Sequence, residues 1–334
     1  MRLQDLSRPL ARRCLGISRF CREILGVDLH GARLLVAYST GLDSTALLHL
    51  LHLLRAPLNL TLFAAHAHHG LRPESDIELE HAVQTCKGLN IPCQTARLDV
   101  PSLQAASKEG LEECARTARY AFLRAALQNT RADWIVTAHH GDDLAEDIIM
   151  RLLRGTGWPG LGGMPGVDRE RRLLRPLLDW DKNELRAFLE ETRITWRDDP
   201  SNSVPDRTRN RIRQDVLPLL RRENPSFAKT AHQLWKLAQI DGDYWKTILP
   251  PPFPPMDAYF LPATELGVHQ AARLRIYKAV LDAMGPGQAL ASHLLLLDKA
   301  WVRKNCGRSI QFPGDKIGYV EAEGIRFHFQ RRTL

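Results

Sequence analysis

The sequence has no uninterrupted apolar run of the about 18 to 20 residues that a membrane-spanning helix needs. Its Arg-rich N-terminus also lacks the apolar core of a secretory signal peptide. The six cysteines are scattered and include no C-x-x-C pair. This spacing argues against a zinc site, an iron–sulfur cluster and a disulfide framework. We therefore expect reduced thiols and a cytoplasmic protein that does not bind a membrane.

The chain does carry an excess of positive charge. Of its 334 residues, 46 are Lys or Arg and 38 are Asp or Glu, which gives a formal net charge of +8 and a pI near 9.3. A protein this basic often binds a polyanion, and nucleic acid is the leading candidate. The alternative is a basic surface that is merely solvated.

Strand-like and helix-like segments alternate in the first half of the chain. Short, mainly apolar segments predict strands at 33–38, 60–66, 93–98 and 134–138, and helical spacing predicts helices at 43–55, 75–88, 111–129 and 142–154. This alternation predicts an α/β fold with a doubly wound parallel sheet. Ligands of such sheets bind at the carboxyl ends of the strands.

Composition changes along the chain suggest its domain boundaries. We predict an N-terminal helical extension (1–29), a catalytic domain (30–215), a helical domain (216–249), a Pro-rich linker (250–255) and a small C-terminal domain (256–334). The C-terminal domain reads as helical to about Arg303 and then as antiparallel hairpins. The Gly-rich stretch 154–166 contains G-x-G-x-x-G, but it follows a helix instead of a strand, so we expect a flexible loop or lid there.

The segment "STGLDS" (39–44) joins the first predicted strand to the first predicted helix of the sheet. Small residues and a helix N-terminus at this position form an anion site, and the hydroxyls of Ser39, Thr40 and Ser44 can donate to phosphate. Because the chain has no Gly-Lys dipeptide, a Walker A loop is excluded. Asp43 would repel bare phosphate, so it holds Mg²⁺ or caps the helix.

Histidines and carboxylates follow two of the predicted strands. His66, His68 and His69 lie at the end of the second strand, and His139 and His140 follow the fourth. Asp142, Asp143 and Glu146 lie in the next helix, close to these histidines. Such a set could bind Mg²⁺ or an ammonium group, and a two-metal phosphohydrolase is an alternative. Each histidine taken singly is better explained by a structural role, whereas two clusters at two strand ends favour a site.

Several segments together resemble one family. "YSTGLDSTALL" resembles the PP-loop of ATP pyrophosphatases, usually Ser-Gly-Gly-x-Asp-Ser. "HAHHGLRPES", "EECARTARYAFL", "TAHHGDDLAEDIIMRLLRGTG", "RPLL" and "DDPSNSVPDRTRNRIRQDVLPLL" follow in order. The set resembles the tRNA(Ile)-lysidine synthases over residues 30–222. This resemblance implies a PP-loop, HUP-like sheet domain followed by a helical domain and a small α+β C-terminal domain.

The resemblance implies an ATP-dependent ligase that forms a carbon–nitrogen bond. ATP would adenylate the C2 oxygen of the wobble cytidine in tRNA(Ile) with a CAU anticodon and release pyrophosphate. The ε-amine of free L-lysine would then displace AMP to give lysidine. The implied cofactors are ATP and Mg²⁺, and related enzymes often form homodimers.

The resemblance also assigns roles to residues. ATP would be bound by Ser39, Thr40, Gly41, Leu42, Asp43, Ser44, His66, Arg72 and His139. Catalysis would involve Asp43, His139, Asp142, Asp143, Glu146 and Arg116, with His139 helping to neutralise pyrophosphate. Mg²⁺ would bind Asp43, Asp142 and Asp143. The tRNA phosphates would bind Arg151, Arg154, Arg207, Arg209, Arg211 and Arg213, for which a solvated helix face or internal ion pairs are the alternative.

Three positions depart from the family pattern. Thr40 stands where glycine is usual, His68 replaces Asn or Asp, and Asp147 replaces Thr. A Cβ at position 40 restricts the backbone. Thr40 and Asp147 motivate one alternative, a tRNA-binding protein that has lost its chemistry. Another is a different PP-loop enzyme such as a cytidine thiolase, although the paired cysteines that sulfur transfer usually needs are absent.

Overall fold

The computed structural model describes residues 2–68, 74–106, 110–197, 208–250 and 253–330. Arg72 and Arg207 lie outside these ranges. The chain divides into two compact units, the first formed by Met1–Asp147 and Gly163–Gln233, the second by Ile148–Gly162 and Leu234–Leu334. The domain boundaries expected from the sequence stay predictions. Within the described ranges, no helix has both the length and the apolarity that a bilayer crossing demands.

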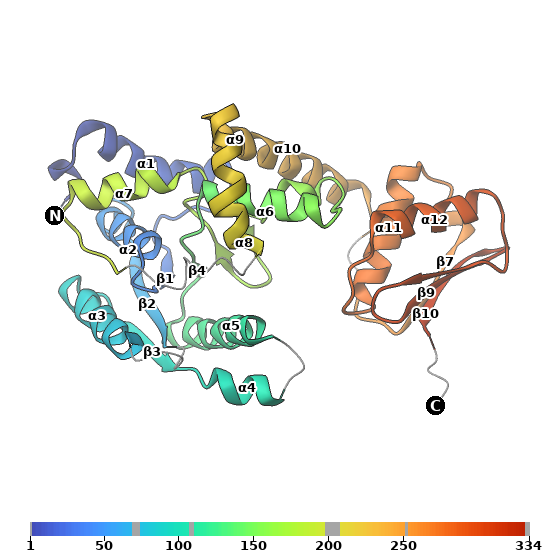
Figure 1. Cartoon of the computed structure of the whole chain (residues 1–334), viewed down its shortest axis with the longest axis horizontal. Coiled ribbons are helices and arrows are strands. Elements are labelled where there is room, and N and C mark those ends of the chain that lie inside the picture. The colour runs from blue at the N-terminus through green and yellow to red at the C-terminus, as the bar shows by residue number, and fades with distance from the viewer. Residues whose placement is uncertain (1, 69–73, 107–109, 198–207, 251–252, 331–334) are drawn as a thin grey trace. The chain divides into compact units, whose positions relative to one another are not determined.

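The first unit is built on a six-stranded sheet (Figure 1). In spatial order its strands are β3 (Cys93–Arg97), β2 (Thr61–His68), β1 (Arg33–Ala37), β4 (Trp134–Val136), β6 (Leu173–Leu174) and β5 (Val167–Asp168). All pairs are parallel except β5 with β6. The four expected strands and the doubly wound parallel order are confirmed. The short β5–β6 pair was not expected, since two-residue strands in an Arg-rich stretch leave no periodic signal.

Helices cover both faces of this sheet. Those that contact its strands are α2 (Leu42–Leu54), α3 (Glu74–Gly88) and α5 (Leu111–Thr130). The other helices of this part of the chain are α1 (Arg8–Glu23), α4 (Val100–Ala106), α6 (Gly141–Leu153) and α7 (Lys182–Glu191). On one face, Leu123 and Leu127 of α5 pack with Leu35 of β1 and Ile135 of β4. Because successive strand residues point to opposite faces, Leu34 and its alternate neighbours face α2, which packs with α1 and α7 (Figure 1).

A second group of helices follows the sheet. It comprises α8 (Thr208–Arg211), one π-helical turn (Ile212–Val216), α9 (Leu217–Glu223) and α10 (Phe227–Ile248). π-Helical turns inside helices are uncommon and often occur at functional sites. Here the turn follows Arg209, and it includes Arg213.

In the second unit, the Gly-rich stretch packs against α10. Its short 3₁₀ turn, Gly160–Gly162, approaches the helix so closely that a Cβ on Gly162 would lie 2.1 Å from the Cβ of Ala238. The Trp158 indole N–H donates to the Asp241 carboxylate. The glycine at this turn therefore permits close packing on a helix, and a flexible loop or lid in the stretch 154–166 stays a prediction.

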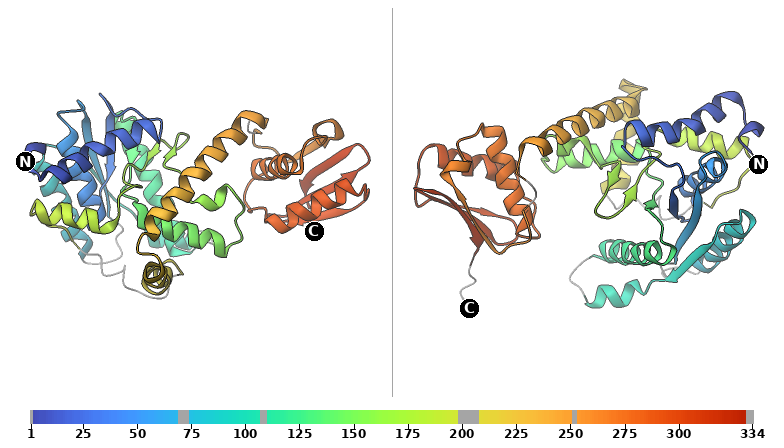
Figure 2. Two further views of the ribbon diagram at one scale, coloured as in Figure 1. Left: turned by 90° about the horizontal axis from the view of Figure 1, so that it is seen from above. Right: turned by 180° about the vertical axis from the view of Figure 1, so that it is seen from behind.

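The C-terminal part of the second unit is a four-stranded antiparallel sheet with two helices on one face (Figure 2). Its elements are β7 (Ala258–Pro262), α11 (Gln270–Ala283), α12 (Ala291–Val302), β8 (Ser309–Phe312), β9 (Lys316–Glu321) and β10 (Gly324–Phe329). Tyr277, Leu297 and Phe327 are fully buried between helices and sheet. The predicted hairpins are confirmed. The all-helical reading of residues 256 to 303 missed β7, which pairs with β10.

Candidate active site

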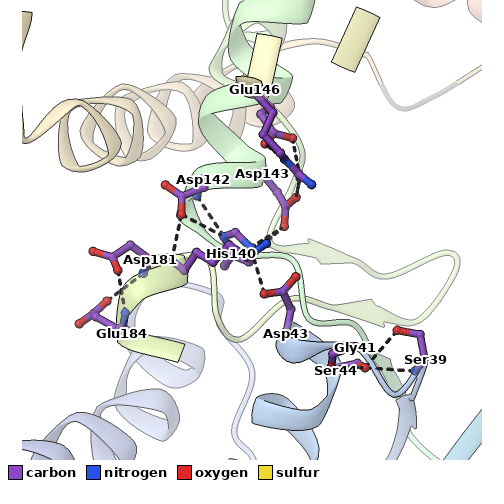
Figure 3. Close-up of polar contacts among 12 residues, drawn as sticks. Ser39, Gly41, Asp43, Ser44, His140, Asp142, Asp143, Glu146, Asp181 and Glu184 are labelled. Atoms are coloured by element: carbon purple, nitrogen blue, oxygen red, sulfur yellow. Dashed lines mark hydrogen bonds and ion pairs between the residues drawn. The ribbon is translucent and has the colours of Figure 1, made fainter. Parts of the chain in front are cut away.

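The site lies where the winding of the sheet reverses. β1 pairs with β2 on one side and β4 on the other, so the loops that follow β1 and β4 leave the sheet next to each other. The first loop leads into α2 and the second into α6. Asp43 Oδ1, at the start of α2, lies 3.5 Å from His140 Nε2, just before α6 (Figure 3).

The loop after β1 is folded around its two serines. The Ser39 N–H donates to Ser44 Oγ at 3.1 Å, and the two hydroxyl oxygens are 3.1 Å apart. Gly41 is the N-cap of α2 and supplies no side-chain cap to the N–H groups of the first turn. Uncapped N–H groups at a helix N-terminus attract anions. The loop thus fits the phosphates of a nucleotide.

Thr40 has a φ of +66°, the left-handed region that favours glycine. It is 1% exposed. Its carbonyl accepts hydrogen bonds from the Thr45 hydroxyl at 3.1 Å and from the Arg197 N–H at 3.0 Å. These bonds hold a β-branched residue in a strained conformation that glycine would adopt without strain.

Among the described residues, one ring nitrogen of His66 takes part in a hydrogen bond and the other does not. Its Nδ1 lies 2.9 Å from the Tyr38 carbonyl, which can only accept, so Nδ1 carries the proton. Its Nε2 is buried and has no hydrogen-bond partner among the residues that the structure describes. Burial lowers the pKa of His66. At the end of this strand, the unprotonated nitrogen of a neutral imidazole can accept a hydrogen bond from an N–H group of a nucleotide base.

Beyond the PP-loop, three carboxylates of α6 meet arginines of the following helices. Glu146, 1% exposed, accepts from Arg213 Nε at 2.5 Å and from Arg209 Nε at 2.8 Å. Asp143 Oδ1 accepts from Arg209 at 2.9 Å and from Arg213 at 3.2 Å. Arg209 and Arg213 are four residues apart and bind the same two carboxylates. The structure thus shows the internal ion pairs raised as the alternative for these two arginines, and the tRNA role predicted for them stays a prediction.

Asp142 has different partners. It accepts from Arg221 of α9 and, at 2.9 Å, from the backbone N–H of Lys182 at the start of α7. The imidazole of His140 lies between the acids, 3.5 Å from Asp143 and 3.6 Å from Asp142 (Figure 3). Burial opposes a charged imidazole, but Asp143, Asp43 and Asp142 outweigh it and raise the pKa of His140 to about 9.

Charges of the two signs balance in this cluster. Although burial alone would raise the pKa of Asp143, His140, His139 and Arg209 hold it well below its usual range. Four carboxylates are then matched by three guanidiniums and one imidazolium, from Asp43, Asp142, Asp143, Glu146, Arg209, Arg213, Arg221 and His140. Because Asp143 and Glu146 are buried, removing an arginine partner from this network leaves carboxylate charge that is costly to keep away from water.

The predicted magnesium ligands fit only in part. The Oδ1 atom of Asp43 is buried, and among the described residues its polar neighbour is His140 Nε2 at 3.5 Å, so a cation would have to share this oxygen with His140 or displace it. Asp142 and Asp143 are already bound to arginines. Across the ranges given above, no group of three His, Cys, Asp or Glu side chains forms a metal site. Mg²⁺ often uses one protein carboxylate plus substrate phosphates, which Asp43 suits.

His139 lies beside the acidic cluster but is uncharged. Its Nδ1 is 2.9 Å from the Thr137 hydroxyl. Burial, reinforced by Arg175, Arg209 and Arg119, lowers its pKa to about 4 despite the opposing charge of Asp143. A neutral imidazole can form a hydrogen bond with an anion, and the role expected of His139 toward pyrophosphate stays a prediction. Arg175, which directly follows β6, was not among the predicted site residues.

The remaining predicted residues are dispersed. Leu42 is a buried first residue of α2. Arg116 is exposed on α5, with its guanidinium 5.6 Å from the centre of the Tyr120 ring. Arg211 is exposed and donates to the Thr208 hydroxyl at 3.1 Å. In the second unit, Arg151 donates to the Gly160 carbonyl at 2.9 Å, and Arg154 is exposed.

The mostly parallel sheet and the loop at its reversal point define a PP-loop domain, and the PP-loop domain family matches residues 17–220. A relative from Nitratidesulfovibrio vulgaris, named tRNA(Ile)-lysidine synthase, is 47% identical over 333 residues, which cover 93% of this chain and 96% of the relative. The chain therefore belongs to the tRNA(Ile)-lysidine synthase family.

Other relatives of the same name are longer. The protein of Alkalilimnicola ehrlichii is 43% identical over 58% of this chain and 43% of its own length. That of Bacillus subtilis is 38% identical over 66% of this chain and 48% of its own length. The chain thus spans about half of these two relatives. A solved structure of the U34-tRNA thiolase NcsA from Methanococcus maripaludis covers 67% of this chain and 78% of its own at TM-score 0.55 and 18% identity, a likeness of fold alone.

Proposed function

We propose that this protein is an ATP-using tRNA-modifying enzyme that ligates free L-lysine to C2 of the wobble cytidine in tRNA(Ile) with a CAU anticodon. The C2 oxygen attacks the α-phosphorus of ATP and pyrophosphate leaves. The ε-amine of lysine then attacks C2, and the oxygen departs with AMP. The product is lysidine. A homodimer stays a prediction from the resemblance.

One observation carries this proposal: a small cavity of mixed charge adjoins the nucleotide loop. Its volume is about 110 Å³, and it is lined by His140, Asp142, Glu146, Lys182, Asn183, Arg213, Leu217 and Arg221. Pockets for drug-sized ligands begin at about 300 Å³, so this one suits a smaller molecule. Acidic and basic walls together complement an amino acid, which carries both charges.

The cavity and the PP-loop share a contact. His140 lines the cavity and lies 3.5 Å from Asp43 of the loop. A lysine held in the cavity would therefore adjoin a nucleotide held by the loop, with its carboxylate on Arg221 or Lys182 and its α-ammonium on Asp142 or Glu146. Such positioning converts a bimolecular attack into a local one.

The residues divide the chemistry between them. Ser39, Ser44 and the first turn of α2 would hold the phosphates, and Mg²⁺ bound by Asp43 would offset their charge. The lysine amine attacks only as the neutral base, so a carboxylate of α6 would accept its proton. Asp142, Asp143 and Glu146 are candidates for that step, each after release from an arginine.

The product tests this function directly. We would incubate the protein with ATP, Mg²⁺, isotope-labelled lysine and a tRNA(Ile) transcript with a CAU anticodon, digest the RNA and identify the labelled nucleoside by mass spectrometry. We expect label in the wobble nucleoside only. Sulfur in that nucleoside would indicate a thiolase, and tight tRNA binding without any product would indicate a binding protein.

A further inference from the structure

Arg175 is a buried guanidinium that forms no ion pair within the part of the chain that the structure describes. It directly follows β6 and is 8% exposed. Its Nη1 donates to the Pro165 carbonyl at 2.7 Å, whereas its Nε is buried and has no hydrogen-bond partner. Asp168 and Asp147 act on its charge only from a distance. Leaving such a group unpaired is costly, so a partner from outside the chain would stabilise it.

Other cations lie close to Arg175. Arg116 is near enough to add to the effect of burial, which is the main reason that the pKa of Arg175 is lowered. Arg175 and Arg119 both act on His139. Arg116 and Arg119 are exposed neighbours on α5, with guanidiniums 5.6 Å and 5.5 Å from the centre of the Tyr120 ring. One buried and two exposed cations therefore gather around one partly exposed aromatic ring.

This cluster lies beside the PP-loop and is separate from it. The Thr137 N–H donates to the Leu174 carbonyl at 3.0 Å, so Arg175 adjoins the loop that carries His139. Only β4 separates β6 from β1, which places Arg175 roughly 10 Å, or two strand spacings, along the sheet edge from the PP-loop. The arginines of the cluster come from α5 and β6, whereas the phosphate loop belongs to α2.

We propose that Arg175, Arg116 and Arg119 form a subsite for a phosphate of the RNA strand next to the target cytidine. The proposal rests on the proposed function, in which the C2 oxygen of that cytidine reaches the α-phosphorus of ATP at the PP-loop. The RNA strand must then continue past the loop along the edge of the sheet. Arginine forks suit phosphate oxygens, and the Tyr120 ring offers a stacking surface for a base.

The test measures binding of an anticodon stem-loop RNA of tRNA(Ile), without ATP or lysine, over a range of salt concentrations. Arg175→Met and the exposed Arg119→Gln should each weaken binding roughly 10- to 100-fold. Each should also reduce the salt slope by about 0.7, the value for one single-strand phosphate contact. Arg131→Gln, an exposed change at the other end of α5, is the matched control and should change neither.

Because Arg119 is exposed, its variant keeps the test valid if Arg175→Met fails to fold. Wild-type affinity and salt slope in Arg119→Gln and in every folded Arg175 variant would overturn the subsite. A second arm measures ATP binding without RNA. Loss of ATP affinity with RNA binding intact would overturn it too, because the anion would then be a nucleotide phosphate. If the variants bind RNA more weakly as expected but the wild-type protein makes no lysidine, the result would support the subsite and refute the proposed reaction.

Discussion

His140 Nε2 lies 3.5 Å from Asp43 Oδ1, so a charged contact joins the helix that follows β1 to the loop that follows β4. The contact spans the reversal point of the sheet, where α/β proteins of this type bind ligands. On its Asp43 side is the loop that fits phosphates, and on its His140 side is the cavity of mixed charge. We infer that the two halves of the reaction meet at this contact.

Asp43→Asn should abolish AMP formation and leave tRNA affinity near normal. The change keeps the shape of the side chain but removes the charge that faces His140 and that would bind Mg²⁺. AMP release from labelled ATP and filter binding of tRNA measure the two effects. Asp99→Asn, at an exposed carboxylate after β3, is the control and should preserve both. Loss of tRNA binding in Asp43→Asn would instead make Asp43 a structural residue.

Arg213→Met should destabilise the first unit by about 3 kcal/mol, because removing one partner leaves buried charge on Glu146 without full compensation. Adding Glu146→Gln should recover part of this loss, since the unpaired charge is then gone. Urea unfolding of both single variants and the double variant measures the coupling energy. Strictly additive losses would show that the Arg213–Glu146 bond contributes nothing to stability.

Thr40→Gly should raise stability by up to about 1 kcal/mol. Glycine removes the strain of a β-branched residue at positive φ, which exceeds the entropic cost of glycine itself. The midpoint of urea unfolding measures this change. In contrast, Thr45→Ala, which removes the hydroxyl bonded to the Thr40 carbonyl, should lower stability. A loss of stability in Thr40→Gly would mean that packing of the threonine side chain outweighs the backbone strain.

His139 should make stability depend on pH between about 6.5 and 4. Its pKa is about 4 in the folded protein and has an ordinary value of 6.5, so in this window the unfolded chain binds a proton that the folded one does not. Stability therefore falls as pH decreases, by up to about 1.4 kcal/mol per pH unit. Urea unfolding at several pH values should show a shallower slope in His139→Gln. Identical slopes would place the folded pKa of His139 near its ordinary value.

The sequence predicted the sheet well because its four predicted strands are mainly apolar and the helices between them have a clear period. Leu35 and Ile135 lie in apolar runs that could only be buried strands, and the polar residues after those runs had to meet at one edge. In contrast, β5 and β6 have two residues each and are too short to show a period. β7 pairs with β10, which is distant in the sequence, and no local pattern records that pairing.

Most residues of the candidate site were predicted from the sequence, but the ion pairs between them were not. Asp143, Glu146, Arg209 and Arg213 were all selected from the sequence, yet as ligands of different molecules. Their mutual bonds arise because α8 and the π-helical turn pack against α6, more than 60 residues earlier in the chain. Arg175 is the arginine of the segment "RPLL" that carries the resemblance, yet it was not selected as a site residue, because the sequence does not show its burial or its lack of a carboxylate partner among the described residues.

The most direct test of the account is AMP formation from labelled ATP when Mg²⁺, lysine and the tRNA(Ile) transcript with a CAU anticodon are each omitted in turn. The initiator tRNA, which also carries a CAU anticodon, is the control substrate. We predict that AMP forms only with all four components present and not with the control tRNA. AMP release without lysine would contradict the assignment of the nucleophile, and ATP consumption without any tRNA would contradict the central claim.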